Sequence, residues 1–558
     1  MTHPRRDAII VGAGHNGLVA AAYLAQAGRD VLVVERDDIP GGAVSTVERF
    51  PGYRVDRGSS AHLMIRHSPI PDELELSAHG LRYLDCDPWA FVPATDSAPA
   101  IVFRTDLDAT CASIERSCGR RDADAYRRFV GTWAPRARAV MSSFYRPATP
   151  ARFGSAFLGL GDTATTARRG PLGRRSGQLL SLTQELMASG DALLDRWFDA
   201  EHLKAGLAWF GAQSGPPMSA PGTAPMIGFA ALMHDIPPGR AVGGSGALTE
   251  ALIHRLAADG GEVRCRSAAH TISRCGDHWR VGFGGDSNGD GDSDGDGESA
   301  CATTVISAAH ILVTLDLLAA GGFDAATIAR WRAEVVVGTG IGMAVRLGTT
   351  GLPDYRDLPA GLPAHGVHSG LGLLVTDRAQ LVRAQAAAAV GELPPRPACV
   401  AMSFSAIDDT LAPPDRHVIN AWAQWHPRHL AGGQDWSTVA ERAADAVCAE
   451  IDRFAPGFGD SIVHRHIQTP ADLESELGLI GGNIMHVEMS IDQMFMWRPH
   501  PDLATHRVPG ADGVLLAGAS THPGGGVTGA SGRIAAHAVL GGGGHLRRFR
   551  TRGGRGLR

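Results

Sequence analysis

The first 35 residues contain two unbroken apolar runs on either side of a helical pattern. Residues 7–14 (DAIIVGAG) predict a strand that ends in a glycine turn, and residues 31–35 (VLVVE) predict a second strand. Between them, residues 16–28 (NGLVAAAYLAQAG) predict an alanine-rich helix. Neither strand alternates polar and apolar positions, which is typical of parallel strands buried on both faces. The N-terminus is therefore expected to form a β-α-β unit.

Similar patterns return in two later parts of the chain. Residues 243–263 predict a periodic helix that leads into a strand, and the short strands HWRVGF and ATTVISAA follow. Residues 513–540 predict a strand, a glycine-rich loop and a helix starting near Thr528. The material between these blocks is less regular and is broken by proline and glycine. One domain is therefore expected to be assembled from three separated segments.

Two segments are expected to be disordered. Residues 284–299 (GGDSNGDGDSDGDGES) have no apolar side chain to bury and lie between two predicted strands. Their start is similar to a calcium-binding loop, but Gly297 stands where the last ligand should be, and the flanks are not helical. We therefore expect a solvated hairpin insert and no metal site. The glycine- and arginine-rich residues 546–558 are expected to form a frayed tail.

Length and composition narrow the class of protein. The 558 residues exceed one hydrophobic core, and 44% hydrophobic with 20% charged residues is typical of globular chains. A net charge of −6 gives no electrostatic reason to expect nucleic-acid binding. The eight cysteines are scattered without metal-like spacing, which favours reduced thiols and a cytoplasmic protein. No signal peptide and no membrane span are expected, while peripheral membrane contact stays open.

The glycine motif after the first strand is typical of a dinucleotide site. Gly12 permits the tight turn, Gly14 lets the backbone approach a pyrophosphate, and Gly17 lets the helix pack closely on the strand. Amides at the helix N-terminus can hold the phosphates. Glu35, at the end of the second strand, can accept hydrogen bonds from ribose hydroxyls. Cofactor contacts at this motif are expected from Gly12, Gly14, His15, Asn16 and Gly17.

The residues after Glu35 favour FAD over NAD. Gly41 and Gly42 follow within one short loop and allow a second close approach of the backbone to the cofactor. This pair is similar to the extended motif of glutathione-reductase-type FAD domains, which a plain NAD domain does not need. We therefore expect FAD, with further contacts from Gly41, Gly42 and Ala43.

These motifs together resemble the phytoene desaturase-like flavoproteins, and most closely the phytoene dehydrogenase-related oxidoreductases of the amine-oxidase superfamily. The resemblance implies an α/β fold in which a discontinuous Rossmann-type FAD-binding domain carries an inserted, mixed α+β substrate domain. Four stretches carry it: residues 11–46, 241–263, 481–499 and 513–540. The implied FAD-binding segments are 1–75, 236–320 and 481–545, and the implied substrate-binding segments are 76–235 and 321–480.

The resemblance also implies where the remaining cofactor contacts lie. Ala269 falls where the family usually has a valine whose backbone contacts adenine. In the C-terminal block, Gly518 and Ala519 should follow the ribityl chain, and the isoalloxazine should meet Gly526, Val527 and Thr528. Ala43 replaces an arginine, and Gly518-Ala519 a Gly-Asp pair, that many relatives have at these positions.

The expected activity is the desaturation of a C–C bond, or a related C–H oxidation, by hydride transfer from substrate carbon to flavin N5. The single lysine, Lys204, is badly placed for the lysine that holds a water near N5 in many amine oxidases of the superfamily. Two other glycine-rich stretches do not supply a second dinucleotide motif. Residues 338–343 have Met343 where a third glycine is needed, and PGGGVTG at 523–529 is followed by too few residues for a second β-α-β unit. Electrons are therefore expected to pass to oxygen, a quinone or another protein.

Two other functions stay open: a non-redox, FAD-dependent cis/trans isomerase and a flavin-binding protein without turnover. Candidate acid/base groups are His486, Glu488 and His522, although each could equally hold backbone or flavin edges. The segment starting at Asp56 either passes close to the flavin or forms a turn with a satisfied carboxylate. The apolar content of residues 215–233 fits a substrate tunnel or an ordinary core. A small apolar or natural-product-like substrate is expected.

Overall fold

The computed structural model describes residues 5–150, 183–284, 297–338 and 341–541. Most of the acidic insert expected at 284–299, and all of the tail expected at 546–558, lie outside the described residues. The insert was expected to extend to residue 299, but the structure places its last two residues in strand β12 (Glu298–Ser307). Glu298 and Ser299 belong to a strand, because both pair with the strand that precedes the insert.

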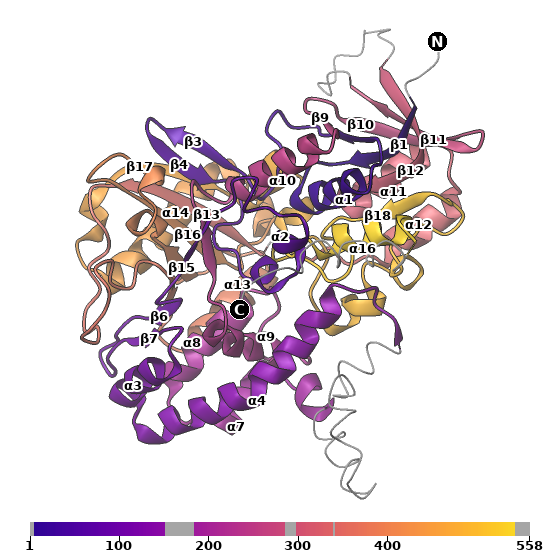
Figure 1. The fold of residues 1–558 in the computed structure, drawn as a ribbon. Helices are drawn as coiled ribbons and strands as arrows, with labels where there is room; N and C mark the ends of the chain where they lie inside the picture. Colours follow the sequence, from indigo (N-terminus) through magenta and orange to yellow (C-terminus); the bar gives the residue numbers. More distant parts are fainter. Residues whose placement is uncertain (1–4, 151–182, 285–296, 339–340, 542–558) are drawn as a thin grey trace, which may run out of the picture.

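The first sheet collects strands from three distant parts of the chain, at the upper right of Figure 1. Its order is β10-β11-β12-β1-β2-β9, and β18 is added beside β12. The pairs β12–β1, β1–β2, β2–β9 and β12–β18 are parallel, whereas β11 runs antiparallel to both β10 and β12. The strands are β1 (Arg5–Val11), β2 (Val31–Val34), β9 (Glu262–Arg264), β10 (Ala269–Cys275), β11 (His278–Phe283), β12 (Glu298–Ser307) and β18 (Val514–Leu516).

Strand β1 is buried on both faces, as its unbroken apolar run predicts. Ala8 and Ile10 enter one hydrophobic cluster, while Ile9 and Val11 enter another. Successive side chains point to opposite faces of a strand, so each cluster marks one face of the sheet. Helices α1 (His15–Gln26), α10 (Gly246–Ala258) and α16 (Ala530–Val539) contribute to the first cluster, and α11 (Ile311–Ala320) and α12 (Ala325–Glu334) to the second. The expected α/β fold with a Rossmann-type domain is confirmed.

The second sheet is mainly antiparallel and has the order β17-β13-β16-β15-β14-β6-β7. One face packs on helix α14 (Trp436–Phe454) through residues such as Val345, Ala421 and Val447. The remaining strands are β6 (Ala90–Val92), β7 (Ile101–Phe103), β13 (Gly342–Thr349), β14 (Leu371–Leu374), β15 (Ala398–Met402), β16 (His417–Gln424) and β17 (Ile462–Gln468). Two small sheets join β3 (Thr46–Phe50) to β4 (Tyr53–Asp56) and β5 (Tyr83–Asp85) to β8 (Gly239–Ala241).

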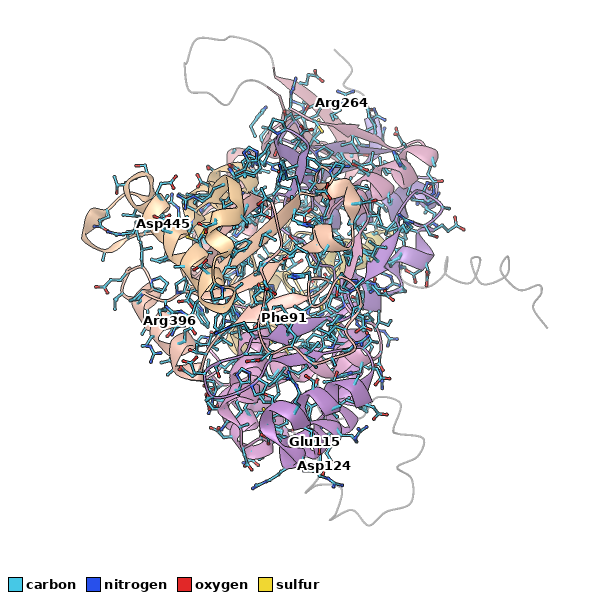
Figure 2. All side chains as sticks on the ribbon, turned by 90° about the vertical axis from the view of Figure 1, so that its left-hand side faces the viewer. Phe91, Glu115, Asp124, Arg264, Arg396 and Asp445 are labelled. Atoms are coloured by element: carbon cyan, nitrogen blue, oxygen red, sulfur yellow. The ribbon has the colours of Figure 1, made fainter. Side chains whose placement is uncertain are left out.

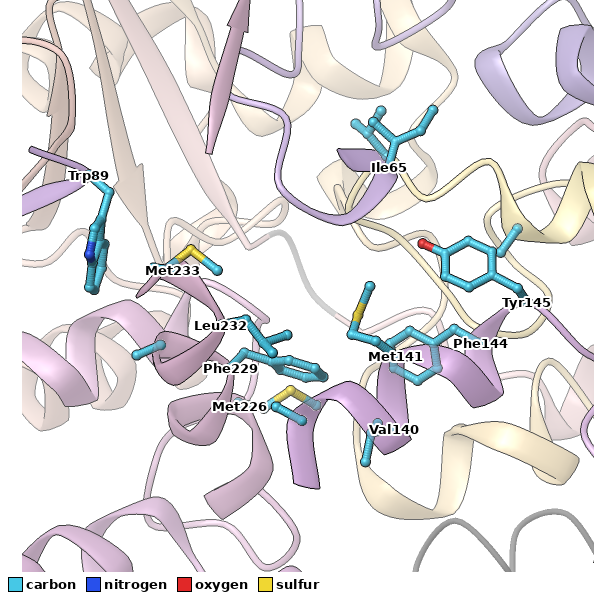
Figure 3. Packing of buried hydrophobic residues seen from close by; sticks show 14 of the residues in the cluster. Ile65, Trp89, Val140, Met141, Phe144, Tyr145, Met226, Phe229, Leu232 and Met233 are labelled. Carbon is cyan, nitrogen blue, oxygen red and sulfur yellow. The ribbon is translucent and has the colours of Figure 1, made fainter. Parts of the chain in front are cut away.

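A helical layer lies below both sheets in Figure 1. Its longest member is α4, and it buries one stripe that includes Tyr126, Phe129, Trp133, Met141 and Phe144. The repeat of three or four residues in this stripe is that of an amphipathic helix. The sequence pattern predicted less regular structure here, and this helix was not predicted. Figure 3 shows the end of α4 packed beside the segment that carries Met226 and Phe229. The layer contains α3 (Leu107–Cys118), α4 (Arg120–Phe144), α7 (Gly190–Trp197), α8 (Glu201–Ala212) and α9 (Ala224–Gly228).

Charged side chains cover the outside of these layers. Figure 2 shows Glu115 and Asp124 projecting from the helical layer and Asp445 from α14, whereas Phe91 of β6 lies inside. Among the described helices, none combines the length and the apolar character needed to cross a bilayer.

Two glycine-to-alanine substitutions should have opposite effects on stability. A Cβ at Gly17 would collide with the carbonyl oxygen of Gly12, which is backbone and cannot turn aside. At Gly131, inside α4, no described atom lies within 4 Å of the added Cβ. We expect Gly131→Ala to raise the unfolding free energy by about 0.5–1 kcal/mol and Gly17→Ala to lower it by more than that amount. Denaturant unfolding of both variants measures this, and equal effects would contradict the packing of α1 on β1.

Candidate functional site

The glycines of the turn between β1 and α1 differ in the space around them: an added side chain would find room at Gly14 but not at Gly17. Gly12 has φ +97°, which a residue with a side chain rarely adopts. A Cβ at Gly14 would have no described atom within 4 Å, whereas Gly17 touches the backbone of Gly12. Gly14 also forms an isolated parallel bridge with Gly41, so the second glycine loop lies beside the first. The structure thus brings the predicted glycines together around an open space.

Glu35 holds this turn in place from the end of β2. Its carboxylate is 8% exposed and accepts hydrogen bonds from the amide of Ala13 at 2.6 Å and from Asp37 at 3.0 Å. A carboxylate has about four acceptor positions, so it can still accept from a ribose. The amide of Ser267 donates to the carbonyl of Glu35 at 2.7 Å, and that loop leads directly into Ala269. The two residues expected at the adenosine end therefore lie on adjoining segments.

Two polar atoms at the start of α1 are buried without a partner among the described residues. They are Nε2 of His15 and Oδ1 of Asn16. Burial lowers the pKa of His15 to about 4, so the ring is neutral near pH 7. Buried polar groups normally have hydrogen-bond partners, and unsatisfied ones call for an explanation such as a ligand. Together with the open space at Gly14, these atoms fit the requirements of an FAD site.

A cavity of about 350 Å³ connects the predicted flavin loops with the helical layer. It contains six of the predicted cofactor residues: His15, Ala43, Ala519, Gly526, Val527 and Thr528. Its apolar walls come from distant elements and include Met64, Phe144, Phe210, Met226, Phe229, Trp422, Met489 and Met494. Gly518 is not among the lining residues and packs instead against Ala309, where an added Cβ would lie 2.6 Å from the carbonyl oxygen.

The C-terminal loop reaches the cavity in a strained conformation. Val527 has φ +54°, which is rare for a β-branched residue and costs on the order of 1–3 kcal/mol. Such strain is concentrated at ligand sites, which supports the role predicted for this loop. Helix α16 begins at Ala530, two residues later than expected, because Gly529 at its N-cap still has φ +67°. The positive end of the helix dipole is therefore adjacent to the loop.

The three candidate acid/base residues lie in different surroundings. His486 lines the cavity and stacks on His310 with 5.4 Å between ring centroids. Glu488 is not among the lining residues, and its Oε1 accepts from the amide of Met489 at 2.9 Å. His522 is also outside the lining and faces the carbonyl of Ser143 at 3.4 Å.

Burial keeps His486 and His522 neutral. It lowers the pKa of His522 to about 3 and that of His486 well below its usual value. The protonated form of either ring is therefore disfavoured at neutral pH. A proton-accepting role for them, which remains a prediction, requires a nearby negative charge.

Asp56 belongs to a satisfied buried turn. Its carboxylate pairs with Arg240 and accepts from Thr46 Oγ1 at 2.8 Å and from the amide of Ser245 at 2.9 Å. Burial acts to raise the pKa of this carboxyl, but the charge and hydrogen bonds of Arg240 outweigh it and lower the pKa below its usual value. Asp56 is thus engaged within the protein, while Gly58 lines the cavity.

Two buried arginines were not expected from the sequence. Arg346 on β13 lines the cavity and donates to the carbonyls of Asp56 and Arg57 at 2.6 and 2.8 Å. Arg498 is fully buried and donates to the carbonyls of Met485 at 2.6 Å and Ala519 at 3.0 Å. The only sequence signal for Arg346 is one charge inside an otherwise apolar run, GMAVRLGT.

Lys204, which the sequence places badly for a role near flavin N5, lies in α8. Its side chain is 13% exposed, and its Nζ lies 3.0 Å from Asp195 and 3.7 Å from Glu201. It is therefore a mostly buried, ion-paired residue of α8. It is not among the residues that line the cavity.

The chain is similar in sequence to known oxidoreductases over nearly its whole length. Residues 10–70 match the NAD(P)-binding Rossmann-like domain family. The chain is 32% identical to pyridine nucleotide-disulfide oxidoreductase domain-containing protein 2 of Mus musculus, over 96% of this chain and 94% of the relative. It is 27% identical to a phytoene dehydrogenase of Streptomyces griseus, over 96% of each chain.

Solved structures share the fold at low sequence identity. A putrescine oxidase matches with a TM-score of 0.58 at 14% identity, covering 96% of this chain and 98% of that one. An oxidoreductase from Methanosarcina mazei matches with a TM-score of 0.56 at 14% identity, covering 96% and 99%. At this identity the likeness shows the fold alone.

Gly14→Ala should separate cofactor binding from folding. Because the added methyl group enters open space, the unfolding free energy of the apoprotein should change by less than about 1 kcal/mol. The same methyl group would obstruct the approach of a pyrophosphate to the backbone, so the Kd for FAD should rise at least about tenfold. Titration of the apoprotein with FAD by fluorescence quenching measures this. An unchanged Kd would show that the pyrophosphate lies elsewhere.

Removing the partner of Asp56 should change how stability depends on pH. In the wild type the folded-state pKa of Asp56 is below its unfolded value of about 3.9, so the stabilisation is fully present above that pH and is lost below it. In Arg240→Gln the buried carboxylate loses the arginine that pairs with it, so its pKa rises and the variant should be less stable by about 3–5 kcal/mol at pH 7. Protonation relieves this cost, so the difference should narrow from pH 7 towards pH 4. Denaturant unfolding across this range tests it, and a constant difference would contradict the pairing.

Proposed function

Because the chain belongs to the phytoene dehydrogenase-related family of FAD-dependent oxidoreductases, we propose that it dehydrogenates a C–C or related C–H centre of a small apolar substrate. FAD would supply the hydride acceptor, and the glycine turns, Glu35 and the C-terminal loop are the segments that would hold it. The observation that carries the proposal is that Gly526–Thr528 and a wall of aromatic and methionine side chains line the same cavity. An apolar molecule in this cavity would contact the loop predicted to lie at the flavin.

The residues around the cavity suit hydride chemistry in several ways. Its apolar wall excludes water from the reacting centre, which favours direct transfer over side reactions. Phe144 and Phe229 pack at 6.2 Å between ring centroids and bury the side of the cavity formed by the helical layer. The N-terminal end of the α16 dipole lies next to Val527 and would stabilise the negative charge of a reduced flavin held there. The main contribution of the protein is therefore orientation and electrostatics.

The ionisable residues that line the cavity favour a neutral or anionic substrate over an ammonium ion. They are His15, His486 and Arg346, of which the two histidines are held neutral and the arginine is cationic. No acid is among the described lining residues, so a cation bound beside Arg346 would meet an unfavourable positive charge. This supports carbon dehydrogenation over the oxidation of a charged amine, although the fold is shared with amine oxidases.

Anaerobic mixing of the holoprotein tests the activity. We expect flavin absorbance to bleach with at least one of squalene, geraniol and geranate, and not with putrescine. Subsequent addition of oxygen or a soluble quinone then identifies an acceptor by the return of the band. Bleaching with putrescine alone would contradict the proposal, and isomerised product without bleaching would favour the isomerase.

Met489→Glu should lower turnover by placing a charge on the apolar wall. Burying a carboxylate there opposes an apolar substrate, so kcat/KM for the probe that bleaches the flavin should fall at least about tenfold. The matched control is Val390→Glu, at a side chain that is 64% exposed and not among the lining residues. Steady-state kinetics with equal FAD content compare the two variants. Equal kcat/KM values would place the substrate outside this cavity.

A further inference from the structure

One wall of the cavity carries a charge among apolar side chains. This wall is a face of the second sheet, on which Ala344 and Arg346 of β13 lie opposite Trp422 and Asn420 of β16. Residues two apart share a face of a strand, and all four of these line the cavity. Val400 and Met402 of the next strand pair with the same two β16 residues and extend the apolar part. Arg346 and Asn420 are therefore a directly opposed polar pair on the cavity side of the sheet.

The guanidinium of Arg346 is only partly satisfied by the protein. Its Nε and one terminal nitrogen donate to backbone carbonyls, and the other terminal nitrogen, Nη1, has no partner among the described residues. Arg346 is 2% exposed, and no described carboxylate lies within 4.0 Å of it. The nearby carboxylate of Asp56 is already engaged by Arg240. Burial lowers the pKa of Arg346 to about 10, so it remains a cation near neutral pH.

The other two fully buried arginines of the described chain use both terminal nitrogens, and each leaves only its Nε without a hydrogen-bond partner among the described residues. Arg240 donates from both to the carboxylate of Asp56. Arg498 donates from both to four backbone carbonyls. Neither is among the lining residues of the cavity. An unpaired buried donor is costly, more so when charged, and holding the turn at Asp56 requires only the two nitrogens that Arg346 already uses.

Asn420 adds a second group on the same wall. Its Nδ2 lies 2.5 Å from Ser60 Oγ, and its Oδ1 has no partner among the described residues. The two ends of an amide can be exchanged, because a serine hydroxyl can donate as well as accept. In the exchanged orientation the free end of Asn420 is a donor. Arg346 and Asn420 then offer two donors and one positive charge.

We propose that Arg346 and Asn420 bind a carboxylate of the substrate, so that the cavity takes an apolar acid: a hydrocarbon chain or ring system that ends in one carboxylate. The inference rests on the proposed function and narrows its substrate class. A single carboxylate matches one guanidinium in charge and offers an oxygen to each donor. A plain hydrocarbon would leave the charged nitrogen unpaired in the complex. The apolar remainder of the wall receives the hydrocarbon part.

Ligand binding to the oxidised holoprotein tests this without turnover. Decanoate and decan-1-ol have equal chain lengths and differ in the charged end group, and perturbation of the flavin spectrum together with calorimetry gives their Kd values. We expect decanoate to bind at least tenfold more tightly than decan-1-ol. Arg346→Gln should raise the Kd for decanoate at least tenfold and change that for decan-1-ol less than twofold. The matched control, Arg383→Gln at a side chain that is 63% exposed, should change neither.

Further variants separate ligand binding from structural roles. Arg346→Lys keeps the charge but not the two-carbonyl tether, so it should retain most of the preference for the acid. Asn420→Asp opposes a carboxylate and should abolish the preference even if Arg346→Gln fails to fold. Equal Kd values for acid and alcohol in the wild type would overturn the inference. So would an Arg346→Gln protein with a shifted flavin potential and an intact preference, because the arginine would then act on the cofactor.

The two proposals can fail separately. A wild-type protein that prefers decanoate but shows no dehydrogenation with any probe would refute the proposed activity and retain the acid site. A protein whose flavin bleaches with a hydrocarbon, but which binds decanoate and decan-1-ol equally, would support the proposed activity and refute the acid site.

Discussion

The close contact between the turn after β1 and the helices around it determines where the rest of the site can lie. Gly17 packs against the carbonyl of Gly12, and Gly532 of α16 packs against the carbonyl of Asn16. These contacts join α1 to its own strand on one side and to the C-terminal helix on the other. Since a side chain at either glycine would collide with these carbonyls, backbone contacts fix the distance of α1 from β1 and from α16. The C-terminal loop is thereby held at the same cavity as the first glycine turn.

Buried arginines provide the corresponding constraint for segments without regular structure. Loops inside a protein must satisfy their carbonyls, and a guanidinium offers five donors in one plane. Arg498 joins the segment of Met485 to the carbonyl of Ala519, and Arg346 joins β13 to the turn after Asp56. Most of the cavity lining is therefore apolar, while the two arginines hold the surrounding loops through their backbone carbonyls. This explains how irregular segments can form a defined site.

The sequence was most informative where structure is local. The first β-α-β unit agrees with its prediction to within about two residues, because the apolar run, the glycine motif and the acid at the strand end all act over short distances. Helix α4 was missed although its apolar spacing was present, since Pro135 and Gly131 interrupt the pattern of a continuous helix. The pairing of β6 with β14 joins residues about 280 positions apart, and no local signal encodes it. The domain boundaries and individual contacts to FAD remain predictions.

The position of Arg346 shows why cavity chemistry is hard to predict from one sequence. In the run GMAVRLGT the arginine is the only polar side chain with a charge, so the sequence pattern does not show which face of the strand it occupies or what it binds. The structure shows that Asn420 of β16 lies directly opposite it. The register between these strands puts both side chains on the face that lacks α14, whereas Val345 and Leu347 point to the core. A shift of one residue would bury the arginine under α14 and turn two apolar side chains toward the cavity. The polarity of this wall is therefore a property of strand register, which the packing of α14 enforces.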